Sequence, residues 1–304
     1  SEKEKAVANR EPEKAKAAAT GEDKFTALIR RVLATTKGYT EPRSLWATSL
    51  SVPMTLADIP TEQWAREQGG PVIRIGDVDM PLQHTRVPYN IDLSRPATAS
   101  VFVQGALGRG CSTTLQTVVT SAAASYAGNF LSFFIYDYNG TSLSPLKDMP
   151  NVSMYATRLD VDTWRRMKGE LYRIRDIRER AFANHGYTSM EQYFARRAAD
   201  GVTGDQYGYI GFVVDGIDVM FADSSQDFDL VDEMTKWPKL SQFGISPIFS
   251  ATTTPTGKFR STMGQLAQHV RLRMNDTPDY ITPLGIEGKK IWQEMPGKQP
   301  GRFI

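Results

Sequence analysis

The sequence predicts an α/β fold, with a mostly parallel sheet and helices on both faces. Segments that resemble strands and helices alternate along the chain, which is the order of elements typical of a parallel sheet. The expected strands span residues 99–104, 131–137, 209–218, 245–251 and 269–274. The strand at 209–218 is almost continuously apolar, as expected where helices cover both faces of a sheet. Helices are expected over residues 112–127, 161–184, 189–199, 230–237 and 263–268.

The composition is that of an ordinary soluble globular protein and excludes several classes. The chain has 304 residues and a formal net charge of only +2, so no nucleic-acid partner is expected. Cys111 is the single cysteine, which excludes a disulfide within the chain and favours a reducing, cytoplasmic compartment. No apolar run is long enough to cross a membrane, so any membrane anchor must lie elsewhere. The three histidines are widely separated and predict no metal site.

Three regions follow from the distribution of apolar residues. Residues 1–24 are rich in Ala, Glu and Lys and predict a flexible leader. Residues 25–60 predict a linker helix, beginning at Phe25 and ending near Gly38, followed by a strap with large apolar anchors such as Trp46. Residues 61–304 are expected to form one compact domain. The helix has an apolar face that needs a partner surface, so the strap is expected to join two domains.

The strongest motif lies between the strand at 99–104 and the helix that follows it. This turn matches the phosphate loop G-x-x-x-x-G-K-[ST], except that Cys111 stands where the lysine belongs. Its glycines let backbone amides converge on phosphate oxygens at a helix N-terminus. The motif predicts weak binding of ATP and Mg²⁺, or none, through Gly105, Gly108, Arg109, Gly110, Cys111, Ser112 and Thr113. The alternative is a glycine-rich connection kept for close packing.

A second motif is the apolar strand that ends in Asp215. A carboxylate there faces the metal beside a phosphate loop, so Ser112 and Asp215 are the expected Mg²⁺ ligands. Hydrolytic enzymes usually place Glu or Asp next to orient water, but this chain has Gly216, which leaves Asp215 and Asp218 as weak catalytic candidates. The alternative is that Asp215 only caps a turn. Each lost electrostatic group costs ~3 kcal/mol of transition-state stabilisation, so hydrolysis is expected to be nearly undetectable.

A long helix over residues 164–186 is expected to be basic on its solvent side. Acidic residues interleave with the basic ones, which favours a solvated face with ion pairs one turn apart over a nucleic-acid surface. The basic residues are Arg165, Arg166, Lys168, Arg173, Arg175, Arg178 and Arg180.

Several ordered motifs resemble one family. VFVQGALGRGCSTTLQTVVTSAAASY, FFIYDYNGTSLSPLKDMPNV, YIGFVVDGID and the final PGRFI resemble an FtsK/SpoIIIE-type ATPase domain of the EccC/EssC motors of type VII secretion. The resemblance extends from Phe25 to Ile304 and includes Asp137 and Gly140 after the second strand. It implies a RecA-like P-loop NTPase fold, and the lead-in SLWATSLSVPMTLADI implies the second of the tandem domains. Cys111, Gly216 and Asn151 depart from the family pattern.

The resemblance also implies function. It implies the soluble, cytoplasmic part of a membrane-anchored, hexameric bacterial motor that exports WXG-type proteins, with adjacent ATPase domains as partners. Downstream tandem domains commonly bind nucleotide poorly, so the expected function is that of a degenerate, regulatory ATPase domain. The alternatives are an active ATPase in which Arg109 or Lys258 replaces the missing ammonium, a DNA translocase, and an interaction module that binds no nucleotide. Cys111→Lys together with Gly216→Glu is expected to gain measurable turnover.

Overall fold

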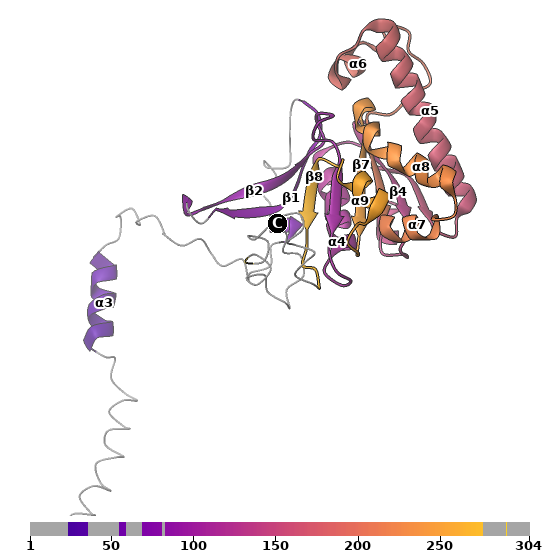
Figure 1. Ribbon diagram of the computed structural model, residues 1–304. Helices are drawn as coiled ribbons and strands as arrows, with labels where there is room; N and C mark the ends of the chain where they lie inside the picture. The colour runs from indigo at the N-terminus through magenta and orange to yellow at the C-terminus, as the bar shows by residue number, and fades with distance from the viewer. Residues whose placement is uncertain (1–23, 36–54, 59–68, 81–82, 276–289, 291–304) are drawn as a thin grey trace, which may run out of the picture. The chain divides into compact units, whose positions relative to one another are not determined.

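The computed structural model describes residues 24–35, 55–58, 69–80, 83–275 and 290, in two compact units that comprise residues 1–48 and 49–304 (Figure 1). The first unit contains α3 (Lys24–Thr35), which confirms the helix expected at Phe25. Its apolar residues Phe25, Leu28, Ile29 and Val32 are exposed. The leader and Trp46 lie outside the described residues, so the division into leader, strap and domain stays a prediction.

The second unit is built on a six-stranded sheet with the order β5-β4-β6-β7-β3-β8. Every pairing between neighbouring strands of this sheet is parallel, which confirms the predicted fold class. The carboxyl ends of these strands therefore lie along one edge. The strands are β3 (Val101–Gln104), β4 (Leu131–Asp137), β5 (Val152–Thr157), β6 (Tyr209–Asp215), β7 (Ile245–Ala251) and β8 (Gln268–Arg271).

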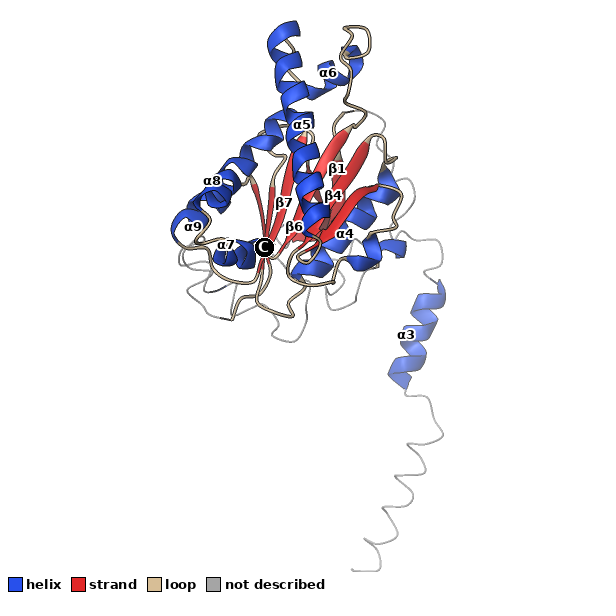
Figure 2. Ribbon diagram, turned by 90° about the vertical axis from the view of Figure 1, so that its right-hand side faces the viewer, coloured by secondary structure: helices blue, strands red, loops and turns tan. Residues whose placement is uncertain are grey.

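Helices cover both faces of this sheet (Figure 2). One face packs against α4 (Cys111–Ser125), and the start of α5 (Val161–His185) packs on the other. That second face also carries α7 (Ile217–Asp223), α8 (Phe228–Lys236), α9 (Gly257–Met263) and the 3-10 helix η5 (Trp237–Phe243). The remaining helical elements are α6 (Met190–Arg196), η1 (Leu56–Asp58) and η4 (Ser144–Leu146).

Two hydrophobic cores result from the alternation of side chains along the strands. Val101 and Val103 pack in the core beneath α4, whereas Phe102 packs in the core beneath the helices of the opposite face. The residues of β3, β4, β6 and β7 are all buried. This two-sided burial explains why these strands read as apolar runs rather than as alternating patterns.

A separate two-stranded antiparallel sheet was not expected from the sequence. It consists of β1 (Val72–Met80) and β2 (Thr85–Asp92), and it projects from the six-stranded sheet in Figure 1. Side chains fix its base: the Tyr126 hydroxyl accepts a hydrogen bond from the Val72 amide at 2.9 Å, and Gln268 Nε2 donates to the Asp92 carbonyl at 2.8 Å. Charged residues within these strands interrupt the apolar run by which the other strands were predicted from the sequence.

Three boundaries differ from the sequence-based expectation. The strand expected over 209–218 ends at Asp215, because Gly216 adopts a left-handed conformation and α7 begins at Ile217. The helix expected over 263–268 was wrong, because α9 spans Gly257–Met263 and ends where that helix was expected to begin. The strand expected over 269–274 is β8, Gln268–Arg271. Strand β5 was missed.

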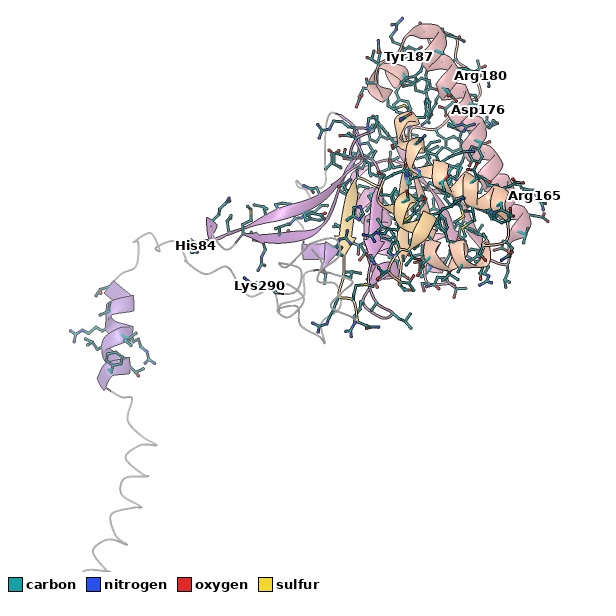
Figure 3. All side chains as sticks on the ribbon, in the orientation of Figure 1. His84, Arg165, Asp176, Arg180, Tyr187 and Lys290 are labelled. Carbon is teal, nitrogen blue, oxygen red and sulfur yellow. The ribbon has the colours of Figure 1, made fainter. Side chains whose placement is uncertain are left out.

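The long helix α5 confirms the expectation for residues 161–184, and its outer side is basic. Arg165, Asp176 and Arg180 are spread along it in Figure 3. Ion pairs one turn apart occur as expected, for example Arg165–Asp162 at 2.8 Å. The placement of Arg178 on the solvent side was wrong. This side chain is fully buried, because Asp205 Oδ2 at 2.8 Å and the carbonyl of Gly208 at 2.7 Å satisfy its guanidinium.

Candidate nucleotide site

The phosphate-loop motif lies where the strand–loop–helix order places it, between β3 and α4. Gly108 and Gly110 have φ angles of 73° and 106°, a region in which glycine is favoured, and Gly110 is the N-cap of α4. The helix N-terminus therefore presents backbone amides at the carboxyl edge of the sheet, the geometry that suits an anion. Gly108 and Thr113 are exposed and Arg109 is half-buried.

Cys111 occupies the place of the phosphate-loop lysine, and its thiol faces the protein interior. Its Sγ lies 3.4 Å from the Gly105 carbonyl and 3.7 Å from the Ala251 carbonyl, and the residue is 7% exposed. Burial, with smaller contributions from Asp215 and Asp218, raises the pKa of the thiol to about 12. The side chain is therefore a neutral part of the core at neutral pH and offers no charge to a phosphate.

Asp215 and Ser112 come together as the sequence predicted. Ser112 Oγ donates to Asp215 Oδ2 at 2.7 Å, and Ser250 Oγ donates to the other carboxylate oxygen. Burial raises the pKa of Asp215, and the two serine hydroxyls partly oppose that effect. The sequence analysis missed Ser250, although its position at the carboxyl end of the strand next to β6 could have indicated it.

Gly216 leaves no room for a side chain. Its φ is +86°, and a Cβ placed there would lie 2.6 Å from Asn139 Cβ. The position next to Asp215 is thus closed by Asn139 as well as empty of a carboxylate. The expectation that Gly216→Glu supplies a catalytic carboxylate is not supported by this geometry.

Asp218 is hydrogen-bonded to the loop that follows β7 and is not exposed beside the phosphate loop. It is 7% exposed in the first turn of α7, and its Oδ2 accepts hydrogen bonds from the amides and hydroxyls of Thr252 and Thr253, at 2.9 to 3.1 Å. These threonines follow β7, so Asp218 fixes the start of the segment between β7 and α9. Lys258, the other candidate cation, is exposed on α9.

Asp137 is a third buried carboxylate at this edge, and the residue-based analysis had not assigned it to the site. It lies beside Asp215 in the β4–β6 register, and its Oδ2 accepts from the Leu143 amide at 2.8 Å and the Tyr155 hydroxyl at 2.9 Å. Within the described part of the chain, no lysine or arginine pairs with Asp137, Asp215 or Asp218.

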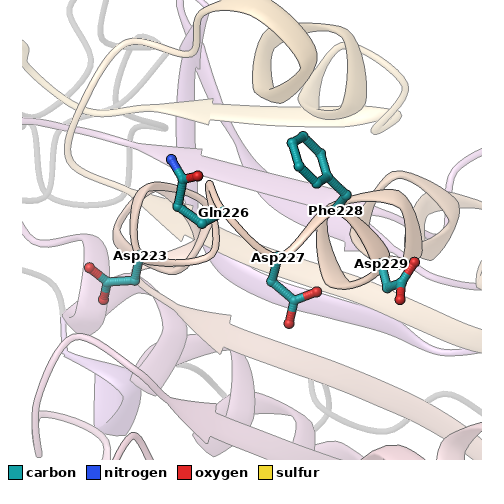
Figure 4. Close-up of a pocket in the computed structure, with 5 residues that line it drawn as sticks. All are labelled: Asp223, Gln226, Asp227, Phe228 and Asp229. Atoms are coloured by element: carbon teal, nitrogen blue, oxygen red, sulfur yellow. The ribbon is translucent and has the colours of Figure 1, made fainter.

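A hollow at the start of α8 lies apart from the phosphate loop. Its carboxylates belong to Asp223, Asp227 and Asp229 (Figure 4). The Phe228 ring and the Asp227 carboxylate point in opposite directions. Two of these acids already have structural roles: Asp223 pairs with Arg158 at 2.8 Å, and Asp227 accepts from the Leu230 amide to cap α8. No three His, Cys, Asp or Glu side chains in the described residues are placed to hold a metal ion together. No described helix is long and apolar enough to span a membrane.

Comparison with known proteins identifies the family of this chain. A sequence model described as the FtsK/SpoIIIE family matches residues 71–285, which include both strands of the hairpin and the phosphate loop. The chain belongs to the FtsK/SpoIIIE family. The ESX secretion system protein EccC of Thermomonospora curvata is 30% identical to this FtsK/SpoIIIE domain over 278 residues, covering 87% of the chain and 20% of the relative. The chain thus spans about a fifth of that relative's length.

Solved structures of FtsK/SpoIIIE domains share the fold. The cytoplasmic domain of the type VII secretion ATPase EccC of Thermomonospora curvata has a TM-score of 0.75 at 29% identity, covering 94% of this chain and 33% of that one. A structure of ATPases 2 and 3 of the same EccC, in complex with a signal sequence peptide, has a TM-score of 0.64 at 30% identity and covers 77% and 40% of the two chains. The RecA-like P-loop fold inferred from the resemblance is confirmed.

Proposed function

We propose that this FtsK/SpoIIIE domain is part of a type VII secretion motor, binds nucleotide weakly, hydrolyses it little or not at all, and regulates contacts between ATPase domains. The similarity to EccC supports the assignment to a secretion motor, since the relatives are secretion-system proteins. The inward-facing Cys111 thiol supports weak binding and carries the proposal.

The residues present fit a nucleotide in part. The amides of Gly105, Ala106 and Arg109 already donate to backbone carbonyls, so the amides at the N-terminus of α4 are the ones that suit phosphate oxygens. Ser112 with Asp215 would hold Mg²⁺, whose charge would offset that of the phosphates. A lysine would add a second positive charge, and within the described residues no lysine or arginine pairs with Asp137, Asp215 or Asp218. A neutral thiol cannot compensate the phosphate charge that a lysine would meet, so affinity should be tens of micromolar or weaker.

Slow turnover follows from the carboxylates. Gly216 has no side chain, Asp218 already accepts four hydrogen bonds, and Asp137 holds the Leu143 amide and the Tyr155 hydroxyl. One carboxylate oxygen of Asp137 and one of Asp218 are thus committed to the fold, while the Oδ1 atom of each is buried without a hydrogen-bond partner among the described residues. The domain would then act through its contacts with neighbouring ATPase domains, whether or not nucleotide is bound.

The wider assembly is proposed from kinship alone. Adjacent ATPase domains in the same chain, a hexameric arrangement, attachment to a membrane through another part of the motor, and WXG-type exported proteins as cargo all follow from the resemblance to EccC. Residues 25–60 would link this domain to the preceding one, and the exposed apolar face of α3 would lie on that neighbour.

Calorimetric titration with ATP·Mg²⁺ and with ADP, followed by a phosphate-release assay, tests the proposal. Weak binding without turnover supports it, and binding below 1 μM contradicts it. Brisk turnover that is lost in Arg109→Gln or Lys258→Gln would establish the active ATPase in which one of these cations replaces the lysine. A Ser112→Ala variant serves as the control for the site: it should weaken whatever binding is seen.

A further inference from the structure

The loop that follows β4, residues 138–143, returns to the nucleotide site and is fixed on two sides. The Asn139 amide donates to the carbonyl of Asp215 at 3.0 Å, which joins the loop to the end of β6. Further along the loop, the Ser142 carbonyl accepts a hydrogen bond from Gln116 Nε2 at 2.6 Å. Gln116 belongs to α4, the helix that begins at the phosphate loop. The loop is therefore held between the end of β6 and the phosphate-loop helix.

The side chain of Asn139 is exposed on this loop and lies against Gly216. A Cβ placed on Gly216 would lie 2.6 Å from Asn139 Cβ and 3.2 Å from its Cγ, so Asn139 takes the space beside Asp215 that a side chain at residue 216 would need. Within the described part of the chain, the side-chain amide of Asn139 makes no hydrogen bond. Its two N–H donors and its carbonyl oxygen are thus available to a bound molecule.

The strand order sets which end of a bound nucleotide Asn139 would face. The sheet runs β4-β6-β7-β3, with the phosphate loop after β3, Asp215 at the end of β6 and the Asn139 loop after β4. Ser112 and Asp215 would hold Mg²⁺ between the last two phosphates of a nucleoside triphosphate, the position that this ion takes in P-loop enzymes. The Asn139 loop lies beyond Asp215, on the side away from the phosphate loop. The group nearest to Asn139 would therefore be the terminal phosphate.

We propose that the Asn139 side chain donates a hydrogen bond to the terminal phosphate of bound ATP, and that this contact makes the site prefer ATP over ADP. The contact rests on the proposed function, because it needs a nucleotide in the phosphate loop. An amide suits this place because it donates to an anion without adding negative charge, whereas a carboxylate would repel the phosphate. The domain would then distinguish ATP from ADP through Asn139, without the carboxylate that orients water in hydrolytic enzymes.

Calorimetric titration of the whole chain with ATP·Mg²⁺ and with ADP·Mg²⁺ measures this preference. Asn139→Ala should weaken ATP binding about threefold to tenfold, because a hydrogen bond to a charged group is lost at a solvated place. ADP binding should change by less than about twofold, since ADP has no terminal phosphate for this bond. Asn139→Asp keeps the shape of the side chain and should weaken ATP binding by at least about tenfold, because its carboxylate repels the phosphate.

Asn184→Ala is the matched control. Asn184 is another exposed asparagine, in the last turn of α5, and its loss should change neither affinity. All three variants should keep the unfolding temperature of the natural chain, because both asparagines are exposed. If Asn139→Ala leaves ATP binding unchanged, or weakens ATP and ADP binding equally, Asn139 does not contact the terminal phosphate, while the proposed weak binding stands. If neither nucleotide binds the natural chain, the proposed nucleotide site is wrong and Asn139 has no such role.

Discussion

Gly216→Ala should destabilise the domain by roughly 2–5 kcal/mol, through two separable causes. A side chain at a φ of +86° costs about 1–2 kcal/mol. The added Cβ would also lie 2.6 Å from Asn139 Cβ, and overpacking of this kind costs about 1–3 kcal/mol. Urea unfolding followed by tryptophan fluorescence measures the sum.

Gly201→Ala isolates the first cause. Gly201 has a φ of +71°, and nothing lies within 4 Å of an added Cβ, so this variant should lose only the backbone part, about 1–2 kcal/mol. Asn139→Gly combined with Gly216→Ala should recover the steric part relative to the two single variants. Equal losses for Gly216→Ala and Gly201→Ala, with no recovery in the double variant, would refute the steric argument. If the argument holds, Gly216→Glu cannot restore turnover by itself.

Cys111→Lys should raise ATP affinity by one to two orders of magnitude, about 1.4–2.8 kcal/mol, because it supplies the missing cation. Calorimetry measures the affinity, and an unchanged value would mean that the loop is closed to nucleotide. Asp215→Asn should stabilise the domain at neutral pH. Burial raises the pKa of Asp215, so its folded form holds the proton more tightly, and the stability this provides is complete below about pH 4 and is lost as the pH rises through the raised pKa. Urea midpoints from pH 4 to 7.5 should therefore fall relative to those of Asp215→Asn, and parallel curves would contradict the assignment. Arg178→Met should cost about 3–5 kcal/mol in the same unfolding assay, since it leaves Asp205 buried without that partner; Arg178→Met combined with Asp205→Asn should recover part of the loss, and a loss below 1 kcal/mol would show that the pair is dispensable.

The sheet and its helices could be predicted because most strands are buried on both faces. Such strands read as apolar runs bounded by turns, and the glycine-rich loop gave the order of strand and helix around Cys111. The hairpin β1–β2 could not be found in this way, because its strands contain charged residues such as Arg74 and Asp77, which pair with each other at 2.7 Å and are largely buried. Strand β5 escaped because its residues are only partly buried at the sheet edge.

The site was predicted in its parts but not in its electrostatics. Ser112 and Asp215 meet as their motifs indicated, whereas the inward direction of the Cys111 thiol depends on the end of β7, far away in sequence. The commitment of Asp218 to Thr252 and Thr253 has the same origin. Sequence spacing reports which residues share an edge, and it cannot report which hydrogen bonds they already make.

The phosphate-loop strand acquires its neighbours late. Strand β3 pairs with β7 and β8, so the sheet partners of Val101 are Ile248 on one side and Gln268 on the other, both synthesised much later. Strands β4 and β6 lie between them in sequence and can already pair with each other. Closing such long loops is slow because the chain loses entropy before the contacts form. During synthesis, the segment around Cys111 therefore stays without its sheet until almost the whole domain has left the ribosome, and a chain that stops before β8 exposes a bare strand edge at the centre of its own nucleotide site.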